Sequence, residues 1–135
     1  HGNTAEVANK FAEILRSKGA EKVVVCDLSR TDMAEAVEDA FRYSHLVVAA
    51  ASYDGDVFPV MHDFLHHLAI KNYSKRRIGI IENGSWAPSA GRAMRAIIDT
   101  FKGVTVAESM VTIMSSLKDS DIPALERLAD EVLAE

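Results

Sequence analysis

Apolar positions along the chain follow two alternating patterns. Five segments space their apolar residues three or four positions apart, as on one buried helix face, and they cover residues 4–18, 33–43, 59–70, about 94–101 and 121–135. Between the helical segments lie short apolar runs that predict strands, at 22–27, 45–51, 78–81 and, with a possible interruption, 104–114. The β-branched run 22–27 predicts a strand buried on both faces. Strict alternation of strands and helices predicts an α/β fold of parallel strand–helix–strand units with helices on both faces of the sheet.

Composition places the chain among ordinary globular proteins. Its 135 residues, 48% hydrophobic and 26% charged, predict one domain covering residues 1–135. The apolar runs are too short to cross a bilayer, and a net charge of −5 argues against a nucleic-acid partner. The single cysteine, Cys26, excludes an internal disulfide and predicts a small buried apolar side chain. With no signal peptide in the sequence, we expect a cytoplasmic protein.

The first candidate site is Gly2-Asn3-Thr4, which opens the first predicted helix directly after His1. The first backbone N–H groups of a helix have no internal partner, and the helix dipole favours an anion there. Gly2 permits close approach, Thr4 adds a hydroxyl donor, and the absence of a lysine favours a monophosphate over a triphosphate. An N-capped helix without any ligand explains the motif equally well.

The second candidate site is the segment 52–59, which follows the strand run 45–51. Asp54-Gly55 favours a tight turn whose backbone could meet the edge of a planar ring, and Tyr53 could cover a ring face. A plain connection with a surface tyrosine is the alternative, although the length of the segment favours a functional loop.

The third candidate site is the segment 83–91, rich in glycine, serine and proline, which carries the only tryptophan, Trp86. A large aromatic side chain in such a loop has little local core to join, so stacking on a ligand or a partner is the favoured interpretation. Trp86 folding back over the helix ends is the alternative.

These three segments, HGNT, SYDGDVFP and ENGSWAPSAG, resemble in order and spacing the three FMN-binding loops of flavodoxin-fold domains. They are most similar to the C-terminal flavodoxin domain of flavodiiron proteins, also called A-type flavoproteins. The resemblance extends over all 135 residues. It implies a flavodoxin-like doubly wound parallel sheet of order 2-1-3-4-5 and non-covalently bound FMN. The first strand of that order would precede His1, so we expect it to be missing from this chain.

The resemblance also implies residue roles. The phosphate would lie on Gly2-Asn3-Thr4, and the isoalloxazine would lie between 52–55 and 83–89. His1 stands where the family commonly has tyrosine, and the hydroxyl residue that usually precedes the Gly-Asn-Thr motif is not part of this chain. The implied cofactor-binding residues are His1, Gly2, Asn3, Thr4, Ser52, Tyr53, Asp54, Gly55, Asn83, Gly84, Ser85, Trp86, Ala87 and Ser89.

Other chemistry receives less support from the sequence. His62 and His66 are spaced to share one helix face and could bind a metal, but with His67 they fall on the predicted solvent side of the helix. No arrangement typical of a catalytic nucleophile is present, and we predict neither a metal site nor a complete catalytic site.

The sequence therefore predicts an electron-transfer module with FMN as its cofactor. By resemblance, the electrons would pass to a di-iron centre on another domain of the same polypeptide that reduces O2 or NO, reached across a homodimer. A free-standing flavodoxin or FMN-dependent quinone reductase, acting with a separate redox partner protein, is one alternative. A domain of this fold that has lost FMN and only mediates protein contacts is the other.

Overall fold

The structure is a computed structural model that describes residues 2–28, 30–53, 56–57, 59–84, 90–114 and 116–134, with backbone alone at 2–3, 52–53 and 56–57. Its helices are α1 (Gly2–Ser17), α2 (Met33–Arg42), α3 (Pro59–Ile70), α4 (Ala90–Ile98) and α5 (Ile122–Leu133), with a short 3-10 helix, η1 (Asp119–Asp121). Its strands are β1 (His45–Tyr53), β2 (Asp56–Val57), β3 (Arg77–Gly84) and β4 (Thr105–Met114). None of the helices in the described residues is long and apolar enough to cross a membrane.

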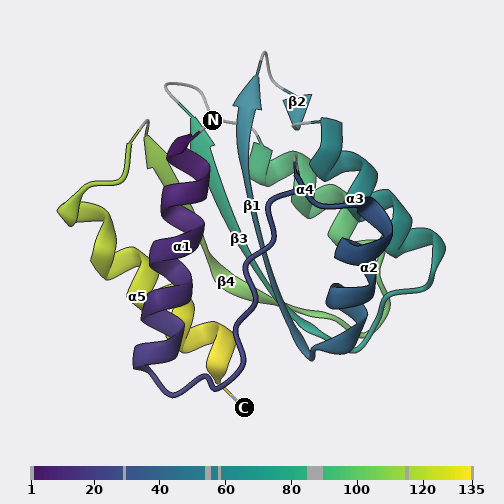
Figure 1. Cartoon of the computed structure of the whole chain (residues 1–135), viewed down its shortest axis with the longest axis horizontal. Coiled ribbons are helices and arrows are strands. Elements are labelled where there is room, and N and C mark those ends of the chain that lie inside the picture. Colours follow the sequence, from purple (N-terminus) through teal and green to yellow (C-terminus); the bar gives the residue numbers. More distant parts are fainter. Residues whose placement is uncertain are drawn as a thin grey trace.

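The sheet has the order β2-β1-β3-β4 (Figure 1). β3 lies in the centre and pairs in parallel with both β1 and β4. The two-residue β2 pairs antiparallel with the end of β1. The ladder between β3 and β4 shifts register between Ile78 and Ile80, which confirms the interruption expected in the last strand run.

Helices cover both faces of the sheet, as the alternating pattern predicts. Figure 1 shows α1 and α5 on one face and α2, α3 and α4 on the other. Two apolar cores follow from this layering, one on each face. Val7 and Phe11 of α1 pack with α5 against Ile81 on the first face, and Leu65 and Met94 pack against Ile80 on the second. Burial of these faces is the main force that holds the layers together.

A buried tyrosine, Tyr73, connects the segment between α3 and β3 to α2. The Tyr73 hydroxyl donates a hydrogen bond of 3.0 Å to the carbonyl oxygen of Ala40 in α2. The Arg76 guanidinium lies over the rings of Tyr73 and Phe41. Burial raises the pKa of Tyr73 to about 12, against the lowering effect of Arg76, so the hydroxyl stays a donor.

The strand expected at 22–27 is not present, and this part of the prediction was wrong. Residues 22–27 join no ladder, although they follow α1 and run beside β1 (Figure 1). Val24 and Val25 are 52% and 42% exposed, so the segment is not buried on both faces either. A parallel strand is defined by hydrogen bonds to a neighbour, and no described residue supplies those bonds here. Cys26 is correspondingly half-buried, where we expected it to be buried.

Candidate functional site

The carboxyl ends of the parallel strands meet at one edge of the sheet. Ala51 of β1 is level with Asn83 of β3, and Asn83 is level with Ile113 of β4. Figure 1 places the first turn of α1 at this same edge, near the ends of β1 and β3. In open α/β sheets, this edge is where ligands bind. The described parts of the three sequence-predicted segments therefore lie at one end of the molecule.

The first segment is the opening turn of a helix, because α1 begins at Gly2. Its first N–H groups have no acceptor within the helix, and no acidic side chain lies in its first turn. Thr4, the first residue of α1 whose side chain is described, is partly exposed. The turn therefore offers unpaired backbone donors and the positive end of a helix dipole, which suit an anion, and Thr4 adds a hydroxyl group to the same turn. His1 lies outside the described residues.

The second segment begins as a strand. Ser52 and Tyr53 are the last residues of β1, and they pair with Val57 and Asp56 of β2. Asp54 and Gly55 lie between these paired residues, outside the described part of the chain. The register places Ser52 and Tyr53 at the carboxyl end of β1, and the roles of all four residues stay predictions.

The third segment starts inside the sheet. Asn83 and Gly84 are the last two residues of β3, and Asn83 is buried, with 6% of its surface exposed. α4 begins at Ala90. The intervening residues lie outside the described part of the chain, so the predicted roles of Ser85, Trp86, Ala87 and Ser89 stay predictions.

The structure adds a residue that the sequence analysis missed, the buried carboxylate of Glu82. It comes just before Asn83 in β3, and only 7% of its surface is exposed. Its Oε2 accepts a hydrogen bond of 2.6 Å from the backbone N–H of Gly91, and its Oε1 accepts one of 2.9 Å from the hydroxyl of Thr112. Glu82 thus satisfies an N–H group in the first turn of α4 and places a negative charge at the positive end of that helix.

This contact leaves little room for a side chain at Gly91. A Cβ atom built on Gly91 would lie 2.6 Å from Oε2 of Glu82 and would also collide with the sulfur of Met110. Met110 is 39% exposed and can move, whereas Glu82 is held on both oxygens. The contact joins the end of β3 to the start of α4, and these are the two ends of the loop that carries Trp86.

Among the residues that the structure describes, the titratable groups with clearly shifted pKa values lie away from this edge. Besides Tyr73, the pKa of Glu131 on α5 is lowered, chiefly by its hydrogen bonds from the hydroxyl and backbone N–H of Ser109. Those bonds hold α5 to the irregular part of β4. Neither group is placed for catalysis at the carboxyl edge.

The histidines of α3 lie where the sequence analysis expected them. His62, His66 and His67 are exposed, and the rings of His62 and His66 are nearly parallel with centroids 6.5 Å apart. Among the residues described by the structure, no group of three or more His, Cys, Asp or Glu side chains is arranged to hold a metal ion.

Comparison with known proteins identifies the fold. No family model matches the chain, and no curated protein does. Among solved structures, the chain is similar to a flavodoxin of Streptococcus pneumoniae TIGR4, with a TM-score of 0.81 and 27% identity, over 98% of this chain and 91% of that one. The fold is therefore flavodoxin-like, as the sequence predicts.

Larger redox proteins contain a similar unit. Rubredoxin:oxygen oxidoreductase from Desulfovibrio gigas matches with a TM-score of 0.88 and 13% identity, over 96% of this chain and 32% of that one. The flavodiiron protein of Giardia intestinalis matches with a TM-score of 0.85 and 16% identity, over 99% and 34%. The chain thus spans about a third of each of these two proteins. At such identities, the likeness concerns the fold alone.

Proposed function

We propose that this chain binds FMN non-covalently at the carboxyl edge of its sheet and transfers electrons. The observation that carries the proposal is the convergence, at one edge of a flavodoxin-like sheet, of an anion-compatible helix start and the ends of β1 and β3. When bound, FMN supplies the redox chemistry, and the protein contributes binding, orientation and electrostatics.

The first turn of α1 is the proposed phosphate site. Gly2, Asn3 and Thr4 offer backbone N–H groups and a hydroxyl group, and the absence of acidic residues in this turn avoids charge repulsion. This donor set is neutral, so it suits a phosphate monoester better than a polyphosphate. FMN carries a single terminal phosphate, and it fits the residues present.

The proposed isoalloxazine site lies between the ends of β1 and β3. Tyr53 ends β1, and Asn83-Gly84 ends the adjacent β3. The candidate ring covers are Tyr53, at the end of β1, and Trp86, in the segment that follows β3. Glu82 and Gly91, which flank the segment that carries Trp86, are joined by a hydrogen bond, so both ends of that segment belong to a fixed part of the fold.

We further propose that the electrons leave to a di-iron domain of the same polypeptide. Support comes from the motif resemblance and from the match to flavodiiron proteins, of which this fold is about a third. The greater identity to a free-standing flavodoxin supports the alternative, a carrier that serves a separate partner protein. The reading frame upstream of His1 distinguishes the two, because the first proposal requires it to encode a di-iron-binding domain.

The experiment that tests the proposed function is loading with FMN followed by redox transfer. Purified protein is incubated with FMN, desalted and examined by absorbance, then reduced anaerobically and mixed with ferricyanide. We expect close to one FMN per chain and rapid reoxidation of the bound flavin. Protein that retains no FMN after desalting would contradict the proposal and favour the interaction-domain alternative.

A further inference from the structure

Two histidines form a ring pair on the solvent side of α3. His62 and His66 are both exposed, and their rings are nearly parallel, with an interplanar angle of 11° and centroids 6.5 Å apart. The opposite side of the helix is packed, because Phe64, Leu65 and Leu68 are buried. That packing fixes the helix backbone from which both rings project. The core therefore positions the pair, although the rings themselves lie in solvent.

The spacing of the pair suits one metal ion held between the rings. Residues four positions apart on a helix lie one above the other, with Cβ atoms about 5–6 Å apart. Imidazole nitrogens bind zinc at about 2.0–2.1 Å, so two of them on one ion lie about 3 Å apart and their ring centres about 5 Å apart. The rings of His62 and His66 must close by roughly 1.5 Å to reach that geometry. Side-chain rotation is sufficient for this, because exposed side chains change rotamer freely.

The ring nitrogens of the pair are available to an ion. Neither ring of His62 and His66 makes a hydrogen bond to any residue that the structure describes. His67, the third histidine of α3, differs, because its Nδ1–H donates a hydrogen bond of 2.7 Å to the carbonyl oxygen of Asp63. His67 is also rotated by about 100° from His66 around the helix axis, so it does not face the same ion. The candidate ligands are therefore two and not three.

We propose that His62 and His66 form a surface site for a divalent late transition-metal ion, Ni²⁺, Cu²⁺ or Zn²⁺, with water in the remaining coordination positions. Imidazole suits these ions, and their affinity for such ligands exceeds that of Mn²⁺. Mg²⁺ and Ca²⁺ prefer oxygen ligands and should not bind here. Two protein ligands leave two positions of a tetrahedral ion open, and the exposure of both rings gives water access to those positions.

An ion held by this pair would connect two successive turns of α3. The connection exists only while the helix is formed, so the folded protein binds the ion more tightly than the unfolded chain does. A ligand that prefers the folded state stabilises it by mass action. Metal binding should therefore raise the unfolding temperature, and this rise is a readout separate from binding itself.

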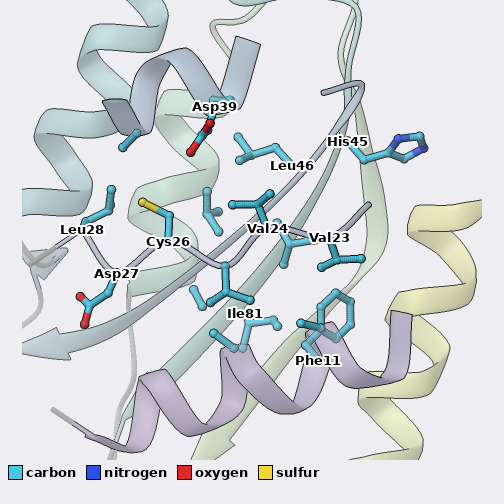
Figure 2. Close-up of a pocket in the computed structure, with 18 of the residues that line it drawn as sticks. Phe11, Val23, Val24, Cys26, Asp27, Leu28, Asp39, His45, Leu46 and Ile81 are labelled. Carbon is cyan, nitrogen blue, oxygen red and sulfur yellow. The ribbon is translucent and has the colours of Figure 1, made fainter. Parts of the chain in front are cut away.

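Cys26 is a second candidate ligand elsewhere in the molecule, since thiolates bind zinc and copper. It is half-buried, and Figure 2 shows it on the wall of a pocket together with Val24 and Leu28. Among the side chains that the structure describes, no three His, Cys, Asp or Glu groups surround a common point there or elsewhere. The test is therefore made in a Cys26→Ser background, so that binding at the thiol is not counted.

Calorimetric titration of the full chain with Ni²⁺ and with Zn²⁺ tests the proposal. We expect about one ion per chain, and no binding of Mg²⁺. His62→Ala and His66→Ala should each weaken binding roughly tenfold or more, because a single imidazole lacks the effective concentration of its partner. His67→Ala removes an exposed histidine from the same helix and should leave binding unchanged.

A transplanted pair distinguishes spacing from composition. In the His62→Ala/His66→Ala protein, Asp63→His creates a new pair four residues apart with His67, at an exposed position, and should restore binding. The ion should raise the unfolding temperature only of proteins that keep a pair. Equal affinities of the parent and the His66→Ala variant would overturn the proposal and place the ion elsewhere. So would a parent that binds neither ion. These measurements use no flavin, so they are independent of the proposed function.

Discussion

Oε2 of Glu82 accepts a hydrogen bond of 2.6 Å from the backbone N–H of Gly91. This contact connects the carboxyl end of β3 to the first turn of α4 across the loop that carries Trp86. A buried carboxylate is costly unless its oxygens are satisfied, and Gly91 and Thr112 satisfy one oxygen each. The two described ends of the predicted ring-binding segment are therefore held together by a residue that need not touch the ligand.

Replacing Glu82 tests that dependence. Glu82→Ala leaves the Gly91 N–H and the Thr112 hydroxyl without their acceptor, and we expect a loss of about 1–3 kcal/mol in the free energy of unfolding. Glu82→Gln should recover much of it, because a glutamine can direct its carbonyl oxygen to Gly91 and its amide to Thr112. Urea unfolding of the two variants measures both effects. An alanine variant as stable as the parent would show that the contact contributes nothing.

Gly91→Ala tests the close approach between the Gly91 backbone and the carboxyl group of Glu82 by changing Gly91 instead of Glu82. Alanine has a higher helix propensity than glycine, by up to about 1 kcal/mol in a helix interior and by less in a first turn such as that of α4. Here its Cβ would meet Glu82, and overpacking should reverse the sign, with a cost of about 1–3 kcal/mol. In a double-mutant cycle with Glu82→Ala, we expect the two changes to be non-additive, because removing the carboxylate relieves the collision. If the effects of the two changes on the free energy of unfolding simply add, the cost of Gly91→Ala does not come from its contact with Glu82.

The sequence predicted the layers of this fold well because they depend on local patterns. The run 45–51 became β1, and the positions of Met94 and Ile98 at helical spacing became the buried face of α4. It failed at 22–27, because pairing depends on a neighbouring strand and not on the composition of the segment. Glu82 was missed because a carboxylate at the end of an apolar run resembles ordinary strand termination. Its partner lies nine residues away, at a helix start that only tertiary structure brings near.

We expect Thr4 to contribute to binding of the FMN phosphate and not to binding of the isoalloxazine ring. Thr4→Val removes the hydroxyl donor of the first turn of α1 while keeping the shape of the side chain. If this turn holds the FMN phosphate, FMN binding should weaken by about 1.5–3 kcal/mol, the value of a hydrogen bond to a charged group. Riboflavin, which lacks the phosphate, is the matched control and should bind both proteins alike. Equal losses for the two ligands, measured by calorimetry, would mean that Thr4 acts on the fold.

Trp86 is the only tryptophan, so its fluorescence reports on one loop. If it stacks on the isoalloxazine, titration with FMN should quench that fluorescence strongly. Trp86→Ala should weaken FMN binding by about 1–3 kcal/mol, the scale of one lost stacking partner. The stability of the apoprotein should change little. Unchanged tryptophan emission at saturating FMN would exclude stacking and favour a packing role.

Glu131 should make a pH-dependent contribution to stability. Hydrogen bonds from Ser109 lower its pKa below the ordinary value of 4.5, so the folded state favours the carboxylate. The resulting stabilisation is fully present above about pH 4.5 and is lost as the pH falls through the folded-state pKa. Glu131→Gln should therefore be less stable than the parent at pH 7, by under about 1 kcal/mol since the group is solvated. The difference should shrink in acid, and a pH-independent difference would contradict this account.

The most direct test of the account is a backbone amide NMR titration with FMN and, in parallel, with riboflavin. It locates the ligand without relying on any variant. We predict that FMN shifts the amide signals of Gly2 to Thr4 together with those of Asn83 and Gly84, and that riboflavin shifts only the second group. Unchanged signals at the first turn of α1 with saturating FMN would contradict the proposed phosphate site. Shifts confined to a surface away from the carboxyl edge would contradict the proposed function as a whole.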